Sequence, residues 1–110
     1  MTIDKIAAVL PVDDLGAAAK AWAAALGVAP TFVDGERWAQ FDVAGGRLCL
    51  AGLDRASDSP GLMLKVADLE AARAALAAAG FSPGEIAQGP HERRFSLALP
   101  GGDTTFYQPS

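Results

Sequence analysis

The chain has 110 residues, of which 51% are hydrophobic and 20% are charged, with a net charge of −4 at pH 7. This length and composition are typical of one globular domain and exclude a disordered chain. The acidic balance argues against nucleic acid as a partner, because phosphate binding needs clustered Lys and Arg. The single cysteine, Cys49, excludes an intramolecular disulfide. No signal segment or apolar run of membrane length is present, so we expect a cytoplasmic protein that does not contact a membrane.

The first elements are predicted from an apolar run and an alanine-rich run. Residues 3–12 are mostly apolar and predict a strand. Asp14 then stands where a helix N-cap is expected, because its carboxylate can accept the free amide hydrogens of the first helical turn. The alanine-rich run 15–26, followed by Gly27, predicts a helix with a glycine stop signal.

Three further strands are expected in residues 31–52 of the first half. The Asp-Gly pair at 34–35 is typical of one tight turn, and the Gly-Gly pair at 45–46 is typical of the next. Residues 54–60 are small and polar and end in proline, which predicts a linker.

The second half repeats the first. VADLEAA at residues 66–72 matches VDDLGAA at residues 12–18 in five of seven positions. Each copy precedes an alanine-rich run that stops at a glycine. The same features in the same order, repeated at a large spacing along the chain, indicate a repeated structural unit. The expected elements of this half are a strand at 61–66, an N-cap at Asp68, a helix at 69–79 ended by Gly80, and strands at 81–88, 93–99 and 104–108. The Gly-Gly pair at 101–102 is expected to form the turn between the last two strands, as the pair at 45–46 does in the first half.

Two tandem βαβββ modules, residues 1–53 and 61–110, therefore account for the chain, which we expect to be a single domain over residues 1–110. One helix covers only one face of a four-stranded sheet, so a lone module would leave the other face open. We predict an α+β fold in which the two modules form a curved eight-stranded mixed sheet with the helices on the convex side.

Tandem βαβββ modules with V-x-D-L-x-A-A at the strand–helix junction resemble the glyoxalase/bleomycin resistance protein/dioxygenase family, the vicinal oxygen chelate superfamily. The resemblance covers essentially the whole chain. Members of this superfamily include isomerases, dioxygenases, thiol transferases and drug-binding proteins without catalytic activity. The fold therefore leaves the function open, and the site must decide it.

The resemblance implies a divalent metal bound by His, Gln or Glu on the first and last strands of each module. The corresponding positions hold Ala7, Cys49, Gly61 and Phe106, or Thr105 if the register is one residue earlier. None is a usual ligand, and one thiol does not make a metal site. We therefore expect no metal and no cofactor, which places the chain in a metal-free branch, with Cys49 as a small apolar filler.

Alternation along the strands predicts which side chains line the open face of the sheet. The expected set combines aromatic rings with a few polar groups, as small-molecule pockets do. Lys65 is expected on the same face. The alternative is that these side chains fill a small cavity or a dimer interface. The predicted ligand-binding residues are Trp38, Gln40, Asp42, Cys49, Met63, Arg94, Ser96 and Phe106.

We expect a protein without catalytic residues that binds a small organic molecule, cationic or aromatic, for instance an antibiotic, as in the bleomycin-resistance branch. The alternative is a lyase, isomerase or dioxygenase-type enzyme that uses non-standard residues, with Asp42, His91, Glu92 and Arg94 as ionisable candidates. A third possibility is a structural or regulatory dimer without a ligand. The resemblance and the exposed edges of an open sheet both predict a homodimer.

Overall fold

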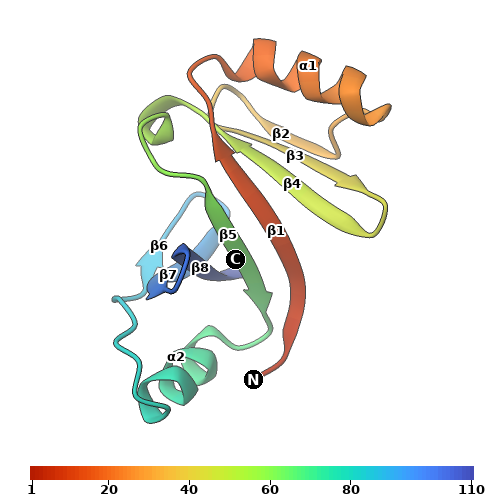
Figure 1. Ribbon diagram of the computed structural model, residues 1–110. Coiled ribbons are helices and arrows are strands. Elements are labelled where there is room, and N and C mark those ends of the chain that lie inside the picture. Colours follow the sequence, from red (N-terminus) through yellow and green to blue (C-terminus); the bar gives the residue numbers. More distant parts are fainter. The chain divides into compact units, whose positions relative to one another are not determined.

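The computed structural model describes residues 1–110, except for the side chain of Asp54. The first half contains β1 (Ile3–Pro11), α1 (Leu15–Leu26), β2 (Phe32–Asp34), β3 (Trp38–Val43), β4 (Gly46–Ala51) and the 3₁₀ helix η1 (Leu53–Arg55). The second half contains β5 (Gly61–Val66), α2 (Leu69–Ala78), β6 (Ala87–Gln88), β7 (Glu92–Leu99) and β8 (Gly102–Pro109). Two βαβββ modules in tandem are therefore confirmed (Figure 1).

The strands are hydrogen-bonded in the order β2-β3-β4-β1-β5-β8-β7-β6. β1 pairs with β4 and β5 pairs with β8 in parallel, whereas the β2–β3, β3–β4, β6–β7 and β7–β8 pairs are antiparallel. This confirms the predicted α+β fold with an eight-stranded mixed sheet. No helix in the described chain has the length and apolar character that crossing a membrane would require.

The chain divides into two compact units. The α1 unit is Ala7–Pro60, and the α2 unit combines Met1–Ile6 with Gly61–Ser110. Strand β1 is divided between them, because its second half, from Ala7 to Pro11, pairs with β4. The first six residues therefore belong with the second module, which the sequence repeat did not indicate.

Both helices begin at the predicted caps. The Asp14 carboxylate accepts a hydrogen bond from the Ala17 amide at 3.0 Å, and the Asp68 carboxylate accepts one from the Ala71 amide at 3.0 Å. These bonds satisfy amide groups that the first helical turn leaves without partners. Gly27 ends α1 in the left-handed conformation, with φ of 73°. The two helices therefore start where the repeated sequence predicts.

The two long hairpins turn one residue earlier than predicted. In the first, Val43 pairs with Gly46, so Ala44 and Gly45 form the turn, with φ of 53° and 77°. Positive φ at both central residues is the geometry of a type I′ turn, which matches the twist of the strands. In the second hairpin the turn is residues 100–101, because Leu99 pairs with Gly102. Each shift changes the cross-strand partner of a given residue by two positions.

The strand predicted at 81–88 is much shorter in the structure, where only Ala87–Gln88 is a strand. The preceding segment is held by Arg73 of α2 and by a backbone hydrogen bond from the Gly84 amide to the Ser96 carbonyl oxygen of β7 at 2.8 Å. The Arg73 guanidinium donates hydrogen bonds to the carbonyl oxygens of Gly84 at 2.7 Å and Pro83 at 3.2 Å. Since proline has no amide hydrogen, a continuous ladder through this segment is disfavoured.

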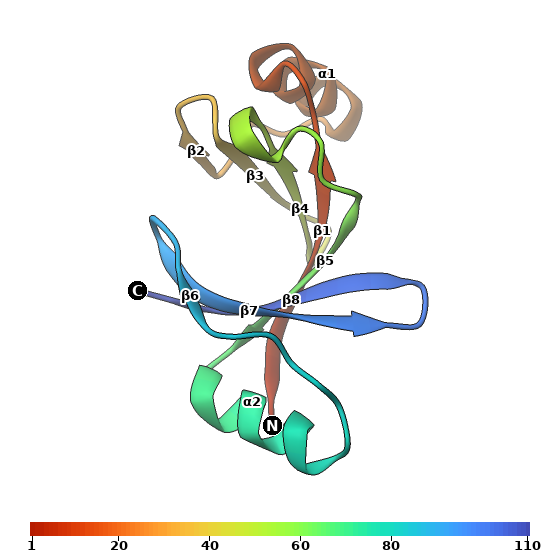
Figure 2. The same ribbon diagram turned by 90° about the vertical axis from the view of Figure 1, so that its left-hand side faces the viewer.

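The core of the α1 unit lies between α1 and one face of β1, β3 and β4. Its fully buried members are Leu15, Ala39, Phe41 and Leu50, with the ring of Trp22 packed against them. Figures 1 and 2 show α1 lying across this group of strands.

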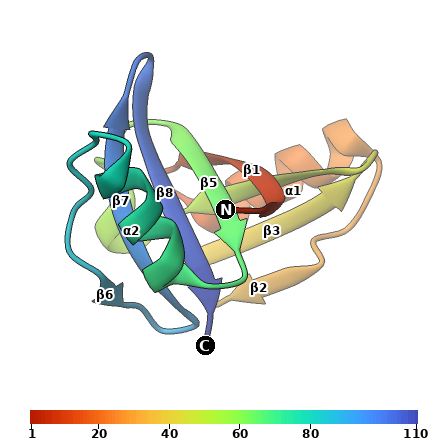
Figure 3. The same cartoon turned by 90° about the horizontal axis from the view of Figure 1, so that it is seen from below.

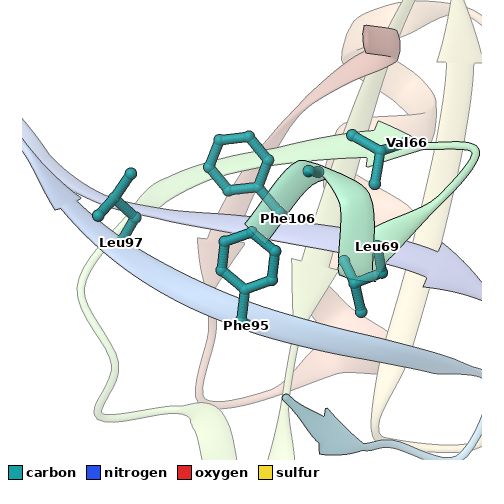
Figure 4. Close-up of a cluster of buried hydrophobic side chains, with 6 residues drawn as sticks. Val66, Leu69, Phe95, Leu97 and Phe106 are labelled. Carbon is teal, nitrogen blue, oxygen red and sulfur yellow. The ribbon is translucent and has the colours of Figure 1, made fainter. Parts of the chain in front are cut away.

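The core of the α2 unit lies between α2 and one face of β5, β7 and β8 (Figure 3). Phe95 and Phe106 stack at its centre, with ring centroids 5.0 Å apart and an interplanar angle of 5°. Figure 4 shows the two rings beside Val66, Leu69 and Leu97. Offset stacking of this kind adds to the free energy of apolar burial.

Candidate functional site

The open face of the α1 unit is the side of β3 and β4 that points away from α1. Because Ala39 and Phe41 are buried under α1, strand alternation turns Trp38, Gln40 and Asp42 to the opposite side. This is the face that the sequence predicts for these three residues. Ligand binding by them stays a prediction.

Asp42 is the centre of a hydrogen-bond network on this open face. Its carboxylate accepts hydrogen bonds from Arg47 Nε at 2.8 Å, Thr31 Oγ1 at 2.7 Å and Gln40 Nε2 at 3.2 Å. The hydrogen bond from Arg47 is the largest cause that lowers the pKa of Asp42 from 3.8 to about 2, against the opposing effect of burial. The carboxylate is therefore ionised throughout the physiological pH range and held in place by its three donors.

Trp38 lies outside both buried clusters and contacts a cation of its own chain. The Arg55 guanidinium is 5.7 Å from the centroid of the Trp38 ring, within cation–π range. Arg55 Nε also donates a hydrogen bond to Asp58 Oδ2 at 3.1 Å. A short loop after β4 therefore brings a positive charge to the tryptophan.

Three residues of this face were missed by the sequence analysis. Arg47 stands directly opposite Asp42 across the β3–β4 hairpin, and the signal for it was available, since a turn at residues 44–45 pairs these two opposite charges. Thr31 comes from the residue before β2, and Arg55 comes from η1. No local pattern in the sequence marks either of them as a member of this face.

Cys49 lies in β4 between Val9 of β1 and Gln40 of β3, and it is 2% exposed. Burial raises the pKa of its thiol to about 12, although Arg47 acts in the opposite direction. The thiol is therefore protonated at neutral pH. Ala7, the predicted ligand position on β1, is 1% exposed. These properties agree with the interpretation of Cys49 as a small apolar filler.

The face predicted for Phe106 is wrong. Phe106 is 3% exposed and lies in the core under α2, stacked on Phe95. The comparison of the modules explains the error: Val9 pairs with Cys49 in the first, and Met63 pairs with Thr105 in the second. The position that corresponds to Cys49 is therefore Thr105, the alternative register. A slip of one residue moves a strand side chain to the other face of the sheet.

The open face of the α2 unit is the side of β5, β7 and β8 that points away from α2. Met63 on β5 and Arg94 and Ser96 on β7 lie on this face by alternation, since Phe95 packs under α2. Met63 is buried and Ser96 is exposed. Arg94 Nη1 donates a hydrogen bond to Glu92 Oε1 at 2.8 Å, which makes an ion pair on this face.

The structure thus divides the predicted set between the two units. Trp38, Gln40, Asp42 and Cys49 belong to the α1 unit, whereas Met63, Arg94, Ser96 and Phe106 belong to the α2 unit. His91 lies just before β7, where its carbonyl oxygen accepts a hydrogen bond from the Ser110 amide at 3.0 Å. Among the described residues, no group of three or more His, Cys, Asp or Glu side chains is placed to bind a metal ion.

Comparisons with known proteins identify the fold. No family model matches the sequence, and no curated protein matches it. Solved structures do match. A structure of NAD-dependent benzaldehyde dehydrogenase from Legionella pneumophila has a TM-score of 0.82 at 13% identity, covering 96% of this chain and 99% of that chain.

Two further matches have the same TM-score. A glyoxalase/bleomycin resistance protein/dioxygenase superfamily member from Vibrio splendidus 12B01 has a TM-score of 0.69 at 16% identity, covering 97% of this chain and 99% of its own. Methylmalonyl-CoA epimerase from Mycobacterium tuberculosis has a TM-score of 0.69 at 22% identity, covering 98% and 87%. At these identities the likeness concerns the fold alone. The fold implied by the repeated junction motif is thereby confirmed: the chain has the fold of solved structures of the glyoxalase/bleomycin resistance protein/dioxygenase superfamily.

Proposed function

We propose that the protein binds a small organic molecule without transforming it, on the open face of the α1 unit. The observation that carries this proposal is the half-buried Trp38, which is not part of the cluster under α1 and lies on the same face as the network of Asp42. A flat apolar surface near a few fixed polar groups is the usual composition of a small-molecule site. Because the donors around Asp42 are already held in place, a ligand would not have to order them.

The residues at the expected metal positions support a role without catalysis. Ala7 and Gly61 have no donor atoms in their side chains, and the Cys49 thiol is buried and protonated. These residues do not fit a divalent cation, which needs several converging oxygen, nitrogen or thiolate donors. With a pKa of about 2, Asp42 is also a poor general base at neutral pH.

The contact between Arg55 and Trp38 favours an aromatic ligand over a cationic one. A cationic ligand that stacked on the indole would have to compete with the guanidinium already 5.7 Å from the ring centroid. A neutral or anionic aromatic ring could stack on the part of the indole that Arg55 leaves uncovered, without charge repulsion from the guanidinium. We therefore propose a planar aromatic molecule as the ligand class.

Tryptophan fluorescence tests this proposal, because the chain has two tryptophans, Trp38 and Trp22. The protein is titrated with a panel of aromatic antibiotics and, for contrast, cationic glycopeptides. A ligand on this face should quench Trp38, so the quenching should persist in Trp22→Phe and disappear in Trp38→Phe. Binding should also stabilise the fold by about 2.7 kcal/mol at a ligand concentration about 100 times the dissociation constant.

Two results would count against the proposal. One is quenching that survives in Trp38→Phe and is lost in Trp22→Phe, which would place the ligand elsewhere. The other is the absence of any saturable binding across the panel. Antibiotic resistance as the biological role and a cytoplasmic location stay predictions.

An enzyme of the same superfamily fold is the alternative function. The observation in its favour is the part-buried ion pair of Glu92 and Arg94, which lies next to His91 at the start of β7. Such ionisable groups could serve acid–base chemistry with non-standard residues. Elemental analysis of the purified protein separates the two functions, since a stoichiometric divalent metal would favour the enzyme.

A further inference from the structure

Three side chains form a row across the open face of the α2 unit. Lys65 of β5 pairs with Tyr107 of β8, and Tyr107 pairs with Arg94 of β7. Adjacent strands are about 4.8 Å apart, so the backbones of the two cationic residues are about 10 Å apart with Tyr107 between them. The next row along the same face contains Thr105 and Ser96, which contribute two hydroxyl groups.

The two cations of this row differ in their partners. Arg94 is paired with Glu92 at 2.8 Å, a bond that uses one of its five N–H donors. Lys65 is half-buried, and within the described part of the chain it has no ion-pair partner. The other acidic residue of this face is the exposed Asp103, beyond Thr105 and next to the hairpin turn. No ion pair among the described residues accounts for Lys65 on this face, so its position there needs another explanation.

The fold itself does not require these cations. The two modules correspond strand by strand, and the same row in the α1 unit is formed by Pro11, Ala51 and Trp38. None of these three side chains is ionisable. Since the same strand pairings form with an apolar row in one module, the Lys and Arg of the other module are not explained by strand pairing or packing.

We propose that the open face of the α2 unit binds an oxyanion, the carboxylate or phosphate group of a small ligand. Lys65 supplies the uncompensated positive charge, Arg94 supplies N–H donors not used by Glu92, and the hydroxyls of Ser96 and Thr105 donate hydrogen bonds. Charge-assisted bonds of this kind are the strong ones in anion recognition. The site does not involve Trp38, so it stands or falls independently of the function proposed above.

The test is a titration of ¹⁵N-labelled protein with inorganic phosphate and, separately, with acetate, at constant ionic strength maintained by chloride. Saturable shifts of the Lys65, Ser96, Thr105 and Tyr107 amides are expected with at least one anion. Tighter binding of phosphate identifies a phosphate ester as the natural ligand group, and tighter binding of acetate identifies a carboxylate. If neither anion gives saturable shifts at these amides, the proposal is wrong.

Two variants with the same change of net charge make the test specific. Lys65→Met keeps the length of the side chain and should weaken anion binding about tenfold or more. Lys20→Met, on the exposed side of α1, should leave binding within about twofold of the wild type, because long-range charge effects are screened by salt. An equal loss in both variants would mean unspecific attraction and would overturn the proposal.

Thermal unfolding without added anion provides a second readout. If Lys65 is kept for binding, its replacement should leave the unfolding temperature unchanged or raise it. If Lys65 is a structural residue, Lys65→Met should lower the unfolding temperature, and this result would contradict the inference. Comparison of the amide spectra of the variant and the wild type establishes that the variant is folded.

Discussion

Replacement of Phe106 by alanine tests which side of β8 forms the core. Phe106 is 3% exposed and stacks on Phe95 at 5.0 Å. Truncation of a buried phenylalanine costs about 3–5 kcal/mol through lost burial and the cavity that remains. The lost stacking places Phe106→Ala in the upper part of that range. With a urea dependence of about 1.5 kcal/mol per molar, a loss of about 4 kcal/mol lowers the unfolding midpoint by roughly 2.7 M.

The matched control is Trp38→Ala, which removes a larger ring from the open face of the α1 unit. Trp38→Ala should lower the free energy of unfolding by less, about 1–2 kcal/mol, because the Trp38 ring is half-buried and makes its cation–π contact with Arg55. Urea unfolding followed by circular dichroism measures both variants. If Trp38→Ala lowers the midpoint more than Phe106→Ala does, the assignment of core and open faces is wrong.

Four further measurements follow from the structure. The pKa of Asp42 is lowered from 3.8 to about 2, so its carboxylate contributes stability above about pH 4 that is lost as the pH falls through about 2. Asp42→Asn should therefore reduce the unfolding free energy by about 1 kcal/mol at neutral pH, after allowance for solvent screening, and by nothing near pH 2. Cys49, at 2% exposure and with a pKa of about 12, should react with a disulfide reagent only after urea unfolding, and a fast reaction of the native protein would contradict its burial. In Gly52→Ala the new methyl group would lie 2.4 Å from the Glu36 carbonyl oxygen, and the required shift should destabilise the protein by roughly 2 kcal/mol in a thermal or urea melt. We also expect a homodimer, because β2 is an edge strand and carries Val33 at 53% exposure; a monomer mass by light scattering at micromolar concentration would refute this.

Most of the fold could be predicted because local signals and the repeat agree. Asp14 and Asp68 cap their helices, and Gly27 ends α1, in positions that a single stretch of sequence specifies. The first of the two shifted turns was placed one residue late because Ala44 adopts a positive φ, which favours glycine over alanine. The strand at 81–88 was predicted too long because the carbonyl oxygens of Pro83 and Gly84 accept hydrogen bonds from Arg73 of α2, a contact that the local sequence does not indicate.

The candidate site could be predicted in part. Alternation sufficed for Trp38 and Asp42, because β3 carries buried residues at every second position. Alternation gave the wrong face for Phe106 because it started from the ligand position that the family resemblance implies. The pairing of β7 with β8 across their hairpin is the correct starting point. A turn at residues 100–101 pairs Phe106 with Phe95, and the apolar residues at alternate positions of β7 would then have placed both under the helix. The contact of Arg55 with Trp38 depends on a loop and has no signal in the sequence.

The division of β1 between the two units has a consequence for how the chain can be cut, permuted or duplicated. Residues 1–6 are synthesised before the α1 unit, whereas the rest of their own unit begins at Gly61, so the α2 unit cannot be completed until translation has passed the whole α1 unit. A fragment that starts at Gly61 would leave β5 without its neighbour β1 and expose an unpaired strand edge. An ancestral or engineered single module taken from the second half of the sequence would therefore have to acquire a replacement for that strand, either from an added segment or from another chain.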